Sequence, residues 1–282
     1  MSAARERPFV QVDVFGDRPC LGNPVAVVLD GTGLSTGRMQ SLAAWTNLSE
    51  TTFVLPPTVP GADYRLRILT PRGELPFAGH PTLGSARAWL DSGATGHRPD
   101  RVVQECAAGL VTVWRLGGGR LAFTAPPLLR TGRLEASEVG RLSAALGVGA
   151  GRVVDHQWVD NGPGWAVLRL ATAAEVLALE PELSLAPDAM AGVIGAHPPG
   201  SAHAFELRTF APRCGVPEDP ACGSMSAAVG QWLATGGAPA AYRVSQGARL
   251  GRAATIEVTT GTDGTVRVGG TTEILVRGTV IL

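Results

Sequence analysis

The sequence predicts an α+β protein made of two similar lobes. Segments with the alternating, β-branched pattern of strands outnumber segments with helical spacing, which favours mixed sheets with few helices. A chain of 282 residues also reaches the size at which one core gives way to two. We therefore expect an N-terminal lobe over residues 1–128 and a C-terminal lobe over residues 129–271.

An internal repeat supports the two lobes. The motifs Leu-Arg, Pro-Arg, Gly and Trp-Leu occur twice in the same order, starting at residues 66, 71, 79 and 89 and again at 207, 212, 223 and 232. The first interval is identical in both copies, and the others differ by three and one residues. Each copy reads as a strand, a loop, a glycine turn and a helix, so the repeat predicts a duplicated lobe.

The first half of the chain contains four expected strands and two expected helices. Residues 9–15, 25–29, 49–55 and 64–70 have strand patterns, with turn chemistry at 22–24. Ser35 can cap a short helix whose apolar face is Met39, Leu42 and Ala43. Pro81 suits the first position of a second helix, which runs to about Ser92.

The second half begins with a segment that carries little pattern. Residues 126–151 are interpreted as a crossing between the lobes, and residues 165–170 as a strand. The run from Thr172 to Glu175 has the spacing of a capping box and predicts a further helix. From Tyr242 onward the pattern is strand after strand with glycine turns.

Composition excludes several classes of function. All 24 basic residues are arginine, so Schiff-base chemistry and the P-loop nucleotide site, which both need lysine, are excluded. The formal net charge is zero with no basic run, and no apolar stretch approaches the length of a membrane span, which argues against nucleic-acid and membrane partners. The four cysteines and five histidines lack metal-ligand spacing. We expect a cytoplasmic protein without a metal.

The repeat pairs two glycine turns, and the chemistry concentrates there. Phe77-Ala78-Gly79-His80-Pro81 surrounds the first turn, and residues 218–224 surround the second, so that Ala78 corresponds to Cys222. Helix N-termini carry partial positive charge and unpaired N–H groups. Two such ends facing each other across a lobe interface would bind a carboxylate without lysine or metal.

At these residues the chain resembles the PhzF-like isomerases of phenazine biosynthesis, within the diaminopimelate-epimerase fold. The resemblance covers nearly the whole chain and rests on these motifs: residues 12–15 with 22–24, 47–51, 75–84, 218–224, and 246–247 with 251–252. It implies lobes that are each a mixed sheet wrapped around a central helix, with residues 272–282 returning to the first lobe. It also implies a homodimer and a cofactor-free isomerase.

The resemblance also assigns roles to site residues. Glu50 matches the acid/base glutamate, His80 and Asp219 match its polar partners, and Gly79, Gly223 and Ser224 match the residues that hold the substrate. Burial would raise the pKa of a carboxyl such as Glu50 and suit it to proton transfer. Plainer alternatives exist for each of these side chains: Glu50 at the surface, His80 or Ser224 as a helix cap, and Asp219 as an Asx turn.

Cys222 departs from the threonine that is common in the family. It matches the second catalytic cysteine of the racemases and epimerases of this fold, but the partner position is Ala78. Cys222 is therefore interpreted as a buried small residue, with a substrate contact as the second reading.

The predicted function is a proton and double-bond shift in a small unsaturated amino acid or carboxylate, in secondary metabolism such as antibiotic biosynthesis. Two alternatives remain: a racemase or epimerase with Glu50 and Cys222 as opposed bases, and a non-catalytic small-molecule binding protein.

Overall fold

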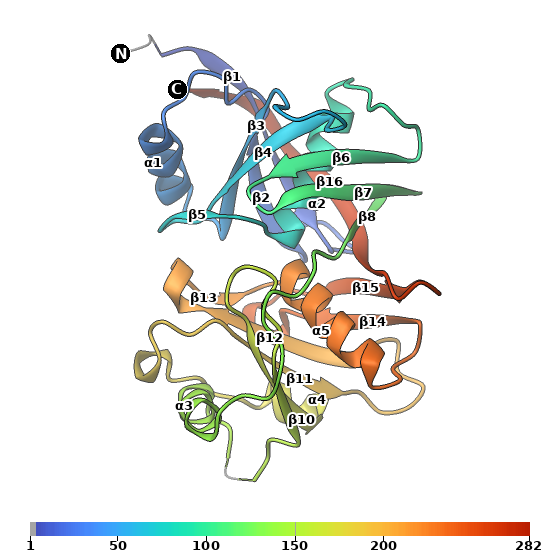
Figure 1. The fold of residues 1–282 in the computed structure, drawn as a ribbon. Helices are drawn as coiled ribbons and strands as arrows, with labels where there is room; N and C mark the ends of the chain where they lie inside the picture. The colour runs from blue at the N-terminus through green and yellow to red at the C-terminus, as the bar shows by residue number, and fades with distance from the viewer. Residues whose placement is uncertain (1–3, 150) are drawn as a thin grey trace. The chain divides into compact units, whose positions relative to one another are not determined.

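The computed structural model describes residues 4–149 and 151–282, and the chain divides into two compact units. Unit 1 runs to Thr124 and also contains Gly269–Leu282, while unit 2 is Ala125–Val268. One long strand, β16 (Val266–Ile281), therefore begins in unit 2 and continues in unit 1. Figure 1 shows that each unit combines strands with helices, and one helix in each unit is mostly buried.

Unit 1 contains nine strands, counting its part of β16, and two helices among the described residues. In chain order the others are β1 (Glu6–Val14), β2 (Asn23–Val28), α1 (Thr36–Thr46), β3 (Glu50–Leu55), β4 (Tyr64–Leu69), β5 (Glu74–Leu75), α2 (Gly79–Asp91), β6 (Arg101–Cys106), β7 (Gly109–Gly117) and β8 (Arg120–Thr124).

The sheet of unit 1 closes on itself. Its strand order is β1-β2-β3-β4-β6-β7-β8-β16, and β1 pairs with β16 to complete the ring. The pairs β2–β3 and β4–β6 are parallel, so the sheet is mixed. The last strand of the chain is thus part of the first unit, and closure leaves the ring without free edges.

Helix α2 occupies the inside of this ring. It packs against seven of the surrounding strands: β1, β2, β3, β4, β6, β7 and β8. Gly84 allows the closest approach, because a Cβ there would lie 2.3 Å from Cγ1 of Val25. Because the surrounding strands pack closely against this helix, they also fix the position of its first turn.

Helix boundaries in unit 1 follow local chemistry. Ser35 caps α1, as predicted, by accepting a hydrogen bond from the Arg38 backbone N–H, and the predicted apolar face of α1 is buried. The prediction for α2 was wrong by two residues. The helix begins at Gly79 with Ala78 as its N-cap, so Pro81 is its third residue. Proline is tolerated there because first-turn N–H groups have no partner within the helix.

Unit 2 contains seven complete strands and three α-helices among the described residues. In chain order they are α3 (Ala136–Leu146), β9 (Asp155–Trp158), β10 (Ala166–Thr172), α4 (Ala173–Leu177), β11 (Ala191–Ala196), β12 (Phe205–Ala211), β13 (Val216–Asp219), α5 (Gly223–Thr235), β14 (Ala241–Gln246) and β15 (Ala254–Thr260); short 3₁₀ turns lie at Leu183–Leu185, Pro212–Cys214 and Ala248–Leu250.

The sheet of unit 2 is also mixed. Its strands follow the order β15-β14-β12-β11-β10-β9, with β10–β11 and β12–β14 parallel. Helix α5 is almost wholly buried and packs on β15, while α4 covers β10, β11 and β12. The capping box that opens α4 is confirmed: Thr172 and Glu175 exchange hydrogen bonds.

The interpretation of residues 126–151 as a crossing was incomplete. Among the described part of that segment, α3 buries Leu142, Ala145 and Leu146 in a core cluster of unit 2. The sequence carries signals of this helix, because Leu142 and Leu146 have helical spacing and Gly147 ends the helix in the left-handed conformation. Only its start is weakly marked, because the N-cap Glu135 makes no side-chain cap bond.

The internal repeat corresponds to a repeated unit of topology. The series β4, β5, α2, β6 in unit 1 matches β12, β13, α5, β14 in unit 2: a short antiparallel strand, a buried helix, then a parallel neighbour. The arginine of each Leu-Arg motif binds a glutamate on the short strand that follows. Arg67 holds Glu74 on β5, and Arg208 holds Glu218 on β13, each through two hydrogen bonds.

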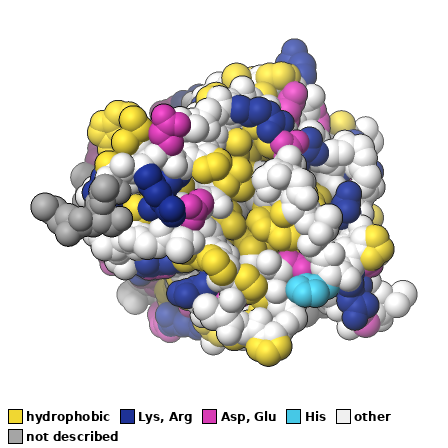
Figure 2. Space-filling view, turned by 90° about the horizontal axis from the view of Figure 1, so that it is seen from above, with side chains coloured by type: hydrophobic (Ala, Val, Ile, Leu, Met, Phe, Trp, Pro, Cys, Tyr) yellow, Lys and Arg dark blue, Asp and Glu magenta, His cyan; other side chains and the backbone are white. Residues whose placement is uncertain are grey.

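The surface carries both signs of charge. Figure 2 shows arginines and acidic side chains scattered among apolar and neutral ones on the face that it presents. None of the helices in the described ranges is long and apolar enough to cross a membrane.

Candidate active site

Glu50 is placed by the junction between α1 and β3. Asn47 ends α1 in the left-handed conformation, with φ of 54°, and turns the chain into the strand. Glu50 is the first residue of β3 and pairs in parallel register with Val25 of β2. Only 6% of Glu50 is exposed, so the alternative of a surface carboxylate is wrong.

His80 lies beside Glu50. The imidazole is 2% exposed, and its Nε2 atom is 3.3 Å from Oε2 of Glu50. On the other edge of the ring, the Asn23 side-chain amide contacts Nδ1 at 3.1 Å. Ser49 in turn donates to the Asn23 side-chain oxygen at 3.1 Å. His80 does not cap its helix with its side chain, because the N-cap is Ala78 and no side-chain cap bond forms.

The imidazole of His80 is neutral at physiological pH. Burial lowers the pKa of His80 to about 3, against a smaller opposing effect of the Pro24 carbonyl. A neutral imidazole carries one ring proton, and the contacts of His80 are compatible with either ring nitrogen carrying it: the Asn23 amide faces Nδ1, and the Pro24 carbonyl accepts a hydrogen bond from the ring. Nε2 lies 3.3 Å from Oε2 of Glu50, and the two atoms do not form a hydrogen bond in this geometry. His80 is therefore a neutral polar neighbour of Glu50, and not a reservoir of positive charge.

Asp219 ends β13 in unit 2 and is 6% exposed. Its Oδ1 accepts a hydrogen bond from the Ala221 backbone N–H at 3.1 Å, which is an Asx turn. The alternative interpretation of Asp219 as an Asx turn is thus confirmed. It shapes the bend between β13 and α5.

Gln246, at the end of β14, clamps the same bend. Its side-chain NH₂ donates to the Asp219 carbonyl at 2.8 Å, and its oxygen accepts from the Cys222 N–H at 3.0 Å. Gln246 is 2% exposed. One amide therefore satisfies a donor and an acceptor of a buried loop, which would otherwise be costly.

Ser224 is the second residue of α5, and two side chains hold it. The Trp165 ring N–H donates to its hydroxyl at 3.2 Å, and the Asn161 amide donates to its carbonyl at 2.9 Å. The alternative of Ser224 as N-cap is wrong, because Cys222 occupies that position. The Cys222 thiol is buried and lies 3.5 Å from the Ser224 hydroxyl.

The two central helices begin alike. Each is 13 residues long, each starts at a glycine, and neither N-cap residue, Ala78 or Cys222, makes a side-chain cap bond. First-turn N–H groups that no cap satisfies can bind an anion, and the helix dipole favours negative charge there. Gly79 and Gly223 are therefore suited to hold an oxyanion of a small molecule.

The structure thus forms two clusters from the predicted residues. Glu50, His80 and Gly79 gather in unit 1, and Asp219, Cys222, Gly223 and Ser224 gather in unit 2. Sequence reasoning gave no role to five supporting side chains: Asn23, Ser49, Asn161, Trp165 and Gln246. Three of them stand in quoted motifs, at residues 22–24, 47–51 and 246–247, and this was the available signal. Asn161 and Trp165 carry no such signal, because they act on Ser224 from distant positions in the chain.

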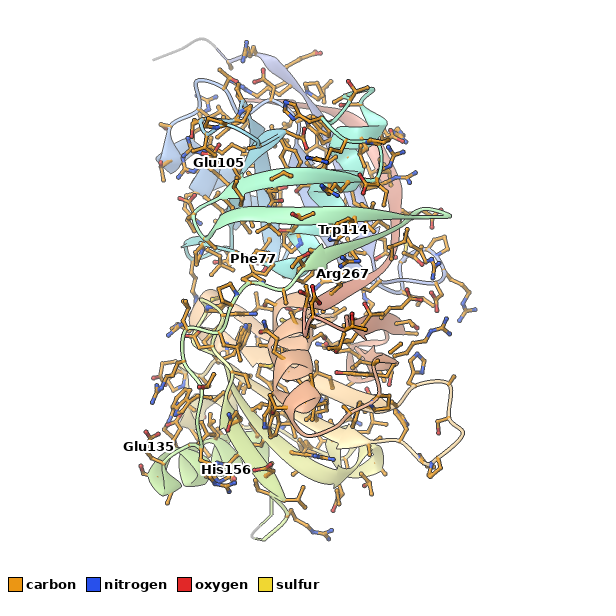
Figure 3. All side chains as sticks on the ribbon, turned by 45° about the vertical axis from the view of Figure 1, so that its right-hand side comes forward. Phe77, Glu105, Trp114, Glu135, His156 and Arg267 are labelled. Carbon is orange, nitrogen blue, oxygen red and sulfur yellow. The ribbon has the colours of Figure 1, made fainter. Side chains whose placement is uncertain are left out.

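No candidate metal centre occurs in the part of the chain that the structure describes: no group of three or more His, Cys, Asp or Glu side chains converges there. His156, for example, accepts a hydrogen bond from the Leu134 N–H. Figure 3 labels His156 and Glu135 in unit 2.

Comparison with known proteins identifies the class, which is that of the isomerases. The trans-2,3-dihydro-3-hydroxyanthranilate isomerase of Pseudomonas aeruginosa is 38% identical over 221 residues, covering 77% of this chain and 76% of its own. A Schizosaccharomyces pombe protein named antisense-enhancing sequence 1 is 39% identical over 294 residues, covering 97% and 98%. The family model described as phenazine biosynthesis-like protein matches residues 12–281. The chain belongs to this family.

Solved structures agree with the fold. A phenazine biosynthesis protein of the PhzF family from Enterococcus faecalis superposes with a TM-score of 0.81 at 23% identity, covering 99% of this chain and 100% of that one. A hydroxyproline epimerase from Agrobacterium vitis gives a TM-score of 0.61 at 15% identity, covering 99% and 93%. The predicted fold class, α+β with a mixed sheet around a central helix in each lobe, is confirmed.

Proposed function

We propose that this isomerase shifts a proton, and with it a double bond, within a small unsaturated amino acid or other carboxylate, without a cofactor. The observation that carries the proposal is the Glu50 carboxyl, which is buried beside a neutral imidazole at 3.3 Å. A carboxyl in such surroundings is a suitable group to remove a C–H proton and to return it. The Glu50 role is the centre of the proposal.

The reaction balances without any further reagent. The Glu50 carboxylate takes a proton from the carbon next to a double bond that is conjugated with the substrate carboxyl. The C–H electron pair forms a new double bond, and the former double bond shifts its electrons toward the carboxyl. Glu50, now protonated, returns the proton to the carbon that bears the carboxyl, and the electron pair held on the carboxyl comes back to form this new C–H bond. Nothing is oxidised or reduced, and the enzyme ends in its starting state.

His80 and Asp219 have assisting roles in this proposal. In this proposal neutral His80 carries its proton on Nε2, 3.3 Å from Oε2 of Glu50, and would favour the carboxylate form of Glu50 before proton transfer. Protonation of Glu50 then frees this donor for negative charge that develops on the substrate. Asp219 sets the bend before α5 through its bond to Ala221, and its other carboxyl oxygen is the atom proposed to meet a polar group of the substrate.

Binding of the substrate is assigned to the starts of the two central helices. Gly79 and Gly223 offer backbone N–H groups without a side chain to obstruct an approaching carboxylate. The Ser224 hydroxyl accepts from Trp165 and contacts the Cys222 thiol at 3.5 Å, and in this proposal its own proton turns to an oxyanion of the substrate. Cys222 is proposed as a substrate contact through its buried position at the N-cap.

The family also suggests the setting of the reaction. Its isomerase from Pseudomonas aeruginosa is named for trans-2,3-dihydro-3-hydroxyanthranilate, a cyclic unsaturated amino acid. We propose a substrate of this class, a place in secondary metabolism such as antibiotic biosynthesis, a cytoplasmic location and a homodimer.

Proton exchange tests the proposal directly. The protein is incubated in deuterium oxide with trans-2,3-dihydro-3-hydroxyanthranilate and other cyclic unsaturated amino acids, and proton signals are followed by NMR. We expect loss of one C–H signal and growth of a deuterated isomer with the wild type, and neither with Glu50→Gln. The deciding quantity is the rate of isomerisation, and the deuterium content of the product shows whether Glu50 returns the same proton or one from the solvent. Isomerisation by Glu50→Gln at the wild-type rate would refute the role of Glu50.

A racemase or epimerase is the second candidate, and one observation favours it. Cys222 places a thiol at the start of a long buried helix, where the dipole stabilises a thiolate. Glu50 and Cys222 would then act as opposed bases on one stereocentre. Incubation with single enantiomers of amino acids, followed by chiral chromatography, separates the two candidates. A purely binding role is disfavoured, because the curated relatives are named as isomerases.

A further inference from the structure

Asp13 is a buried carboxylate of unit 1 to which the proposed reaction gives no role. It is the penultimate residue of β1 and is only 4% exposed. Its Oδ2 accepts a buried hydrogen bond from the Gly22 backbone N–H at 3.2 Å. Hydrogen bonds to an ionised carboxylate are about twice as strong as those between neutral groups. Asp13 therefore ties the end of the loop at residues 15–22 to the strand that precedes this loop.

The loop is shaped around the Asp13 carboxylate. A Cβ at Gly16 would lie 2.7 Å from Asp13 Oδ2, and a Cβ at Gly22 would lie 2.8 Å from Asp13 Oδ1, so both glycines leave room for the carboxylate. Phe15 is buried and has the left-handed conformation, with φ of 69°, which is uncommon for a residue other than glycine. Such a conformation persists only where the surrounding structure holds it in place.

The segment that follows the loop makes the contacts of the site. The Asn23 side-chain amide contacts His80 Nδ1 at 3.1 Å, and the Pro24 carbonyl contacts the same ring. Val25 pairs in parallel register with Glu50. Three consecutive residues therefore determine where the imidazole and the proposed acid/base carboxyl lie relative to each other.

Asp13 holds this segment at two points. It accepts from Gly22, which directly precedes Asn23, and it pairs with Pro24 in the antiparallel ladder of β1 and β2. Loss of the bond to Gly22 would release the chain directly before Asn23, so that the amide would lose its place beside the imidazole. A displacement of about 1 Å in a supporting group can cost about 100-fold in rate.

We propose that Asp13 is a positioning residue of this isomerase. Through Gly22 it keeps residues 23–25 in the place where they contact His80 and pair with Glu50. This rests on the proposed function of Glu50 and extends it to a side chain that acts through the backbone.

A second carboxylate of unit 1 provides the matched control. The Asp63 side chain is 3% exposed and accepts from the backbone N–H groups of His97 at 2.8 Å and Val103 at 2.7 Å. It has the same kind of partner as Asp13, but its partners are not next to a site residue in the chain. Loss of Asp63 should therefore lower stability without an effect on the site.

Two measurements test the proposal in Asp13→Asn, Asp13→Ala and Asp63→Ala. One is long-range ¹H–¹⁵N NMR of protein labelled in histidine, in which His80→Gln identifies the His80 signals. The other is steady-state kinetics with trans-2,3-dihydro-3-hydroxyanthranilate. Asp13→Ala should shift the His80 nitrogen signals and lower kcat by about tenfold or more, with KM within about threefold of the wild type. Asp13→Asn keeps an oxygen that can accept from Gly22 and should lose about threefold in kcat.

The NMR measurement needs no turnover, so it separates this proposal from the proposed function. Absence of turnover in the wild type would refute the activity on this substrate, whereas the His80 signals would still decide the role of Asp13. Unchanged His80 signals in folded Asp13→Ala would overturn the positioning role, and so would an equal shift in Asp63→Ala. If circular dichroism shows that Asp13→Ala is unfolded, Asp13→Asn decides: shifted His80 signals support the role, and unchanged signals overturn it.

Discussion

The Nε2 atom of His80 lies 3.3 Å from Oε2 of Glu50, and both side chains are buried in unit 1. The opposite edge of the imidazole meets the Asn23 amide, which Ser49 orients. The ring therefore lies between these two groups, and in the tautomer proposed above its one proton is on Nε2, on the side of the carboxyl. This relationship makes the proposed acid/base group and its neighbours separately testable.

Glu50→Gln should abolish most of the turnover while retaining binding. The amide has nearly the shape of the carboxyl but cannot take up a proton, so kcat should fall by at least about 100-fold. Steady-state kinetics and calorimetric binding of the same substrate measure the two quantities. Glu273→Gln, on the exposed side of β16, is the control and should behave like the wild type. Turnover of Glu50→Gln within tenfold of the wild type would move the catalytic role elsewhere.

His80 should make the protein less stable in mild acid. Its pKa is about 3 in the folded protein and about 6.5 when unfolded, so between these values the unfolded chain binds more protons. The free energy of unfolding should therefore fall as the pH decreases from 6.5 toward 3, by at most about 1.4 kcal/mol per pH unit. Urea unfolding of the wild type and of His80→Gln measures this slope between pH 7 and pH 5. The variant cannot titrate, and an equal slope in both proteins would contradict the buried neutral imidazole.

Asn23→Asp should change the tautomer of His80. A carboxylate in place of the amide would attract a proton to Nδ1, whereas the amide leaves Nδ1 as an acceptor. Long-range ¹H–¹⁵N NMR of the imidazole should show the proton on Nε2 in the wild type and on Nδ1 in the variant. Activity should fall by about tenfold or more, because Nε2 then loses its donor role or the ring becomes charged.

Ser49→Ala serves as the milder comparison for Asn23. It removes the donor that orients the Asn23 oxygen but leaves the amide in place. A smaller loss of activity and an unchanged tautomer are expected. If the imidazole proton of His80 is found on Nδ1 in the wild type, its assignment to Nε2 is refuted.

Much of the fold could be predicted because it depends on local patterns. The Ser35 cap, the apolar face of α1 and the capping box of α4 each follow from a few neighbouring residues. The repeat could also be seen in the sequence, because both units have the same order of strands and helix. In each unit an arginine, Arg67 or Arg208, makes the same kind of contact with a glutamate. By contrast, α3 was missed although Leu142 and Leu146 have helical spacing and Gly147 ends the helix; the core that these residues enter is supplied by distant strands.

The sequence allowed the main site residues to be predicted, but not the side chains that hold them in place. Glu50 and His80 stand in motifs, but their contact depends on a parallel strand pair and on a helix inside a closed sheet. The role of Gln246 depends on two hydrogen bonds to residues 24 and 27 positions away in the chain. No local pattern of the sequence encodes such long-range bonds.

The two repeat-related arginines should differ in their contribution to stability. Arg208 is 4% exposed, bonds to Glu218 at 2.8 and 2.9 Å, and also donates to the Leu179 carbonyl at 2.7 Å. Arg208→Met leaves the Glu218 carboxylate, whose side chain is 12% exposed, without its partner and should lower the free energy of unfolding by about 3 kcal/mol. Arg67→Met should cost about 1 kcal/mol or less, because Glu74 is 36% exposed.

Urea unfolding at neutral pH compares these two variants. The double variant Arg208→Met with Glu218→Gln should recover part of the loss, because no unpaired charge remains buried. Equal losses for Arg67→Met and Arg208→Met would show that burial does not set the difference between the two pairs.

Cys222 distinguishes a double-bond shift from racemisation. A thiol base must ionise, and an ordinary cysteine with a pKa of about 8.5 is mostly protonated at neutral pH. The start of α5 would favour the thiolate, but the corresponding N-cap in unit 1 is Ala78, which supplies no opposing thiol.

We expect Cys222→Thr, which restores the residue common in the family, to retain at least about a tenth of the activity, and Cys222→Ser to behave alike. Loss of more than about 1000-fold in both variants, with the circular dichroism spectrum unchanged, is the size of effect expected on removing a general base. That result would favour a racemase in which Glu50 and Cys222 act on opposite faces of one carbon.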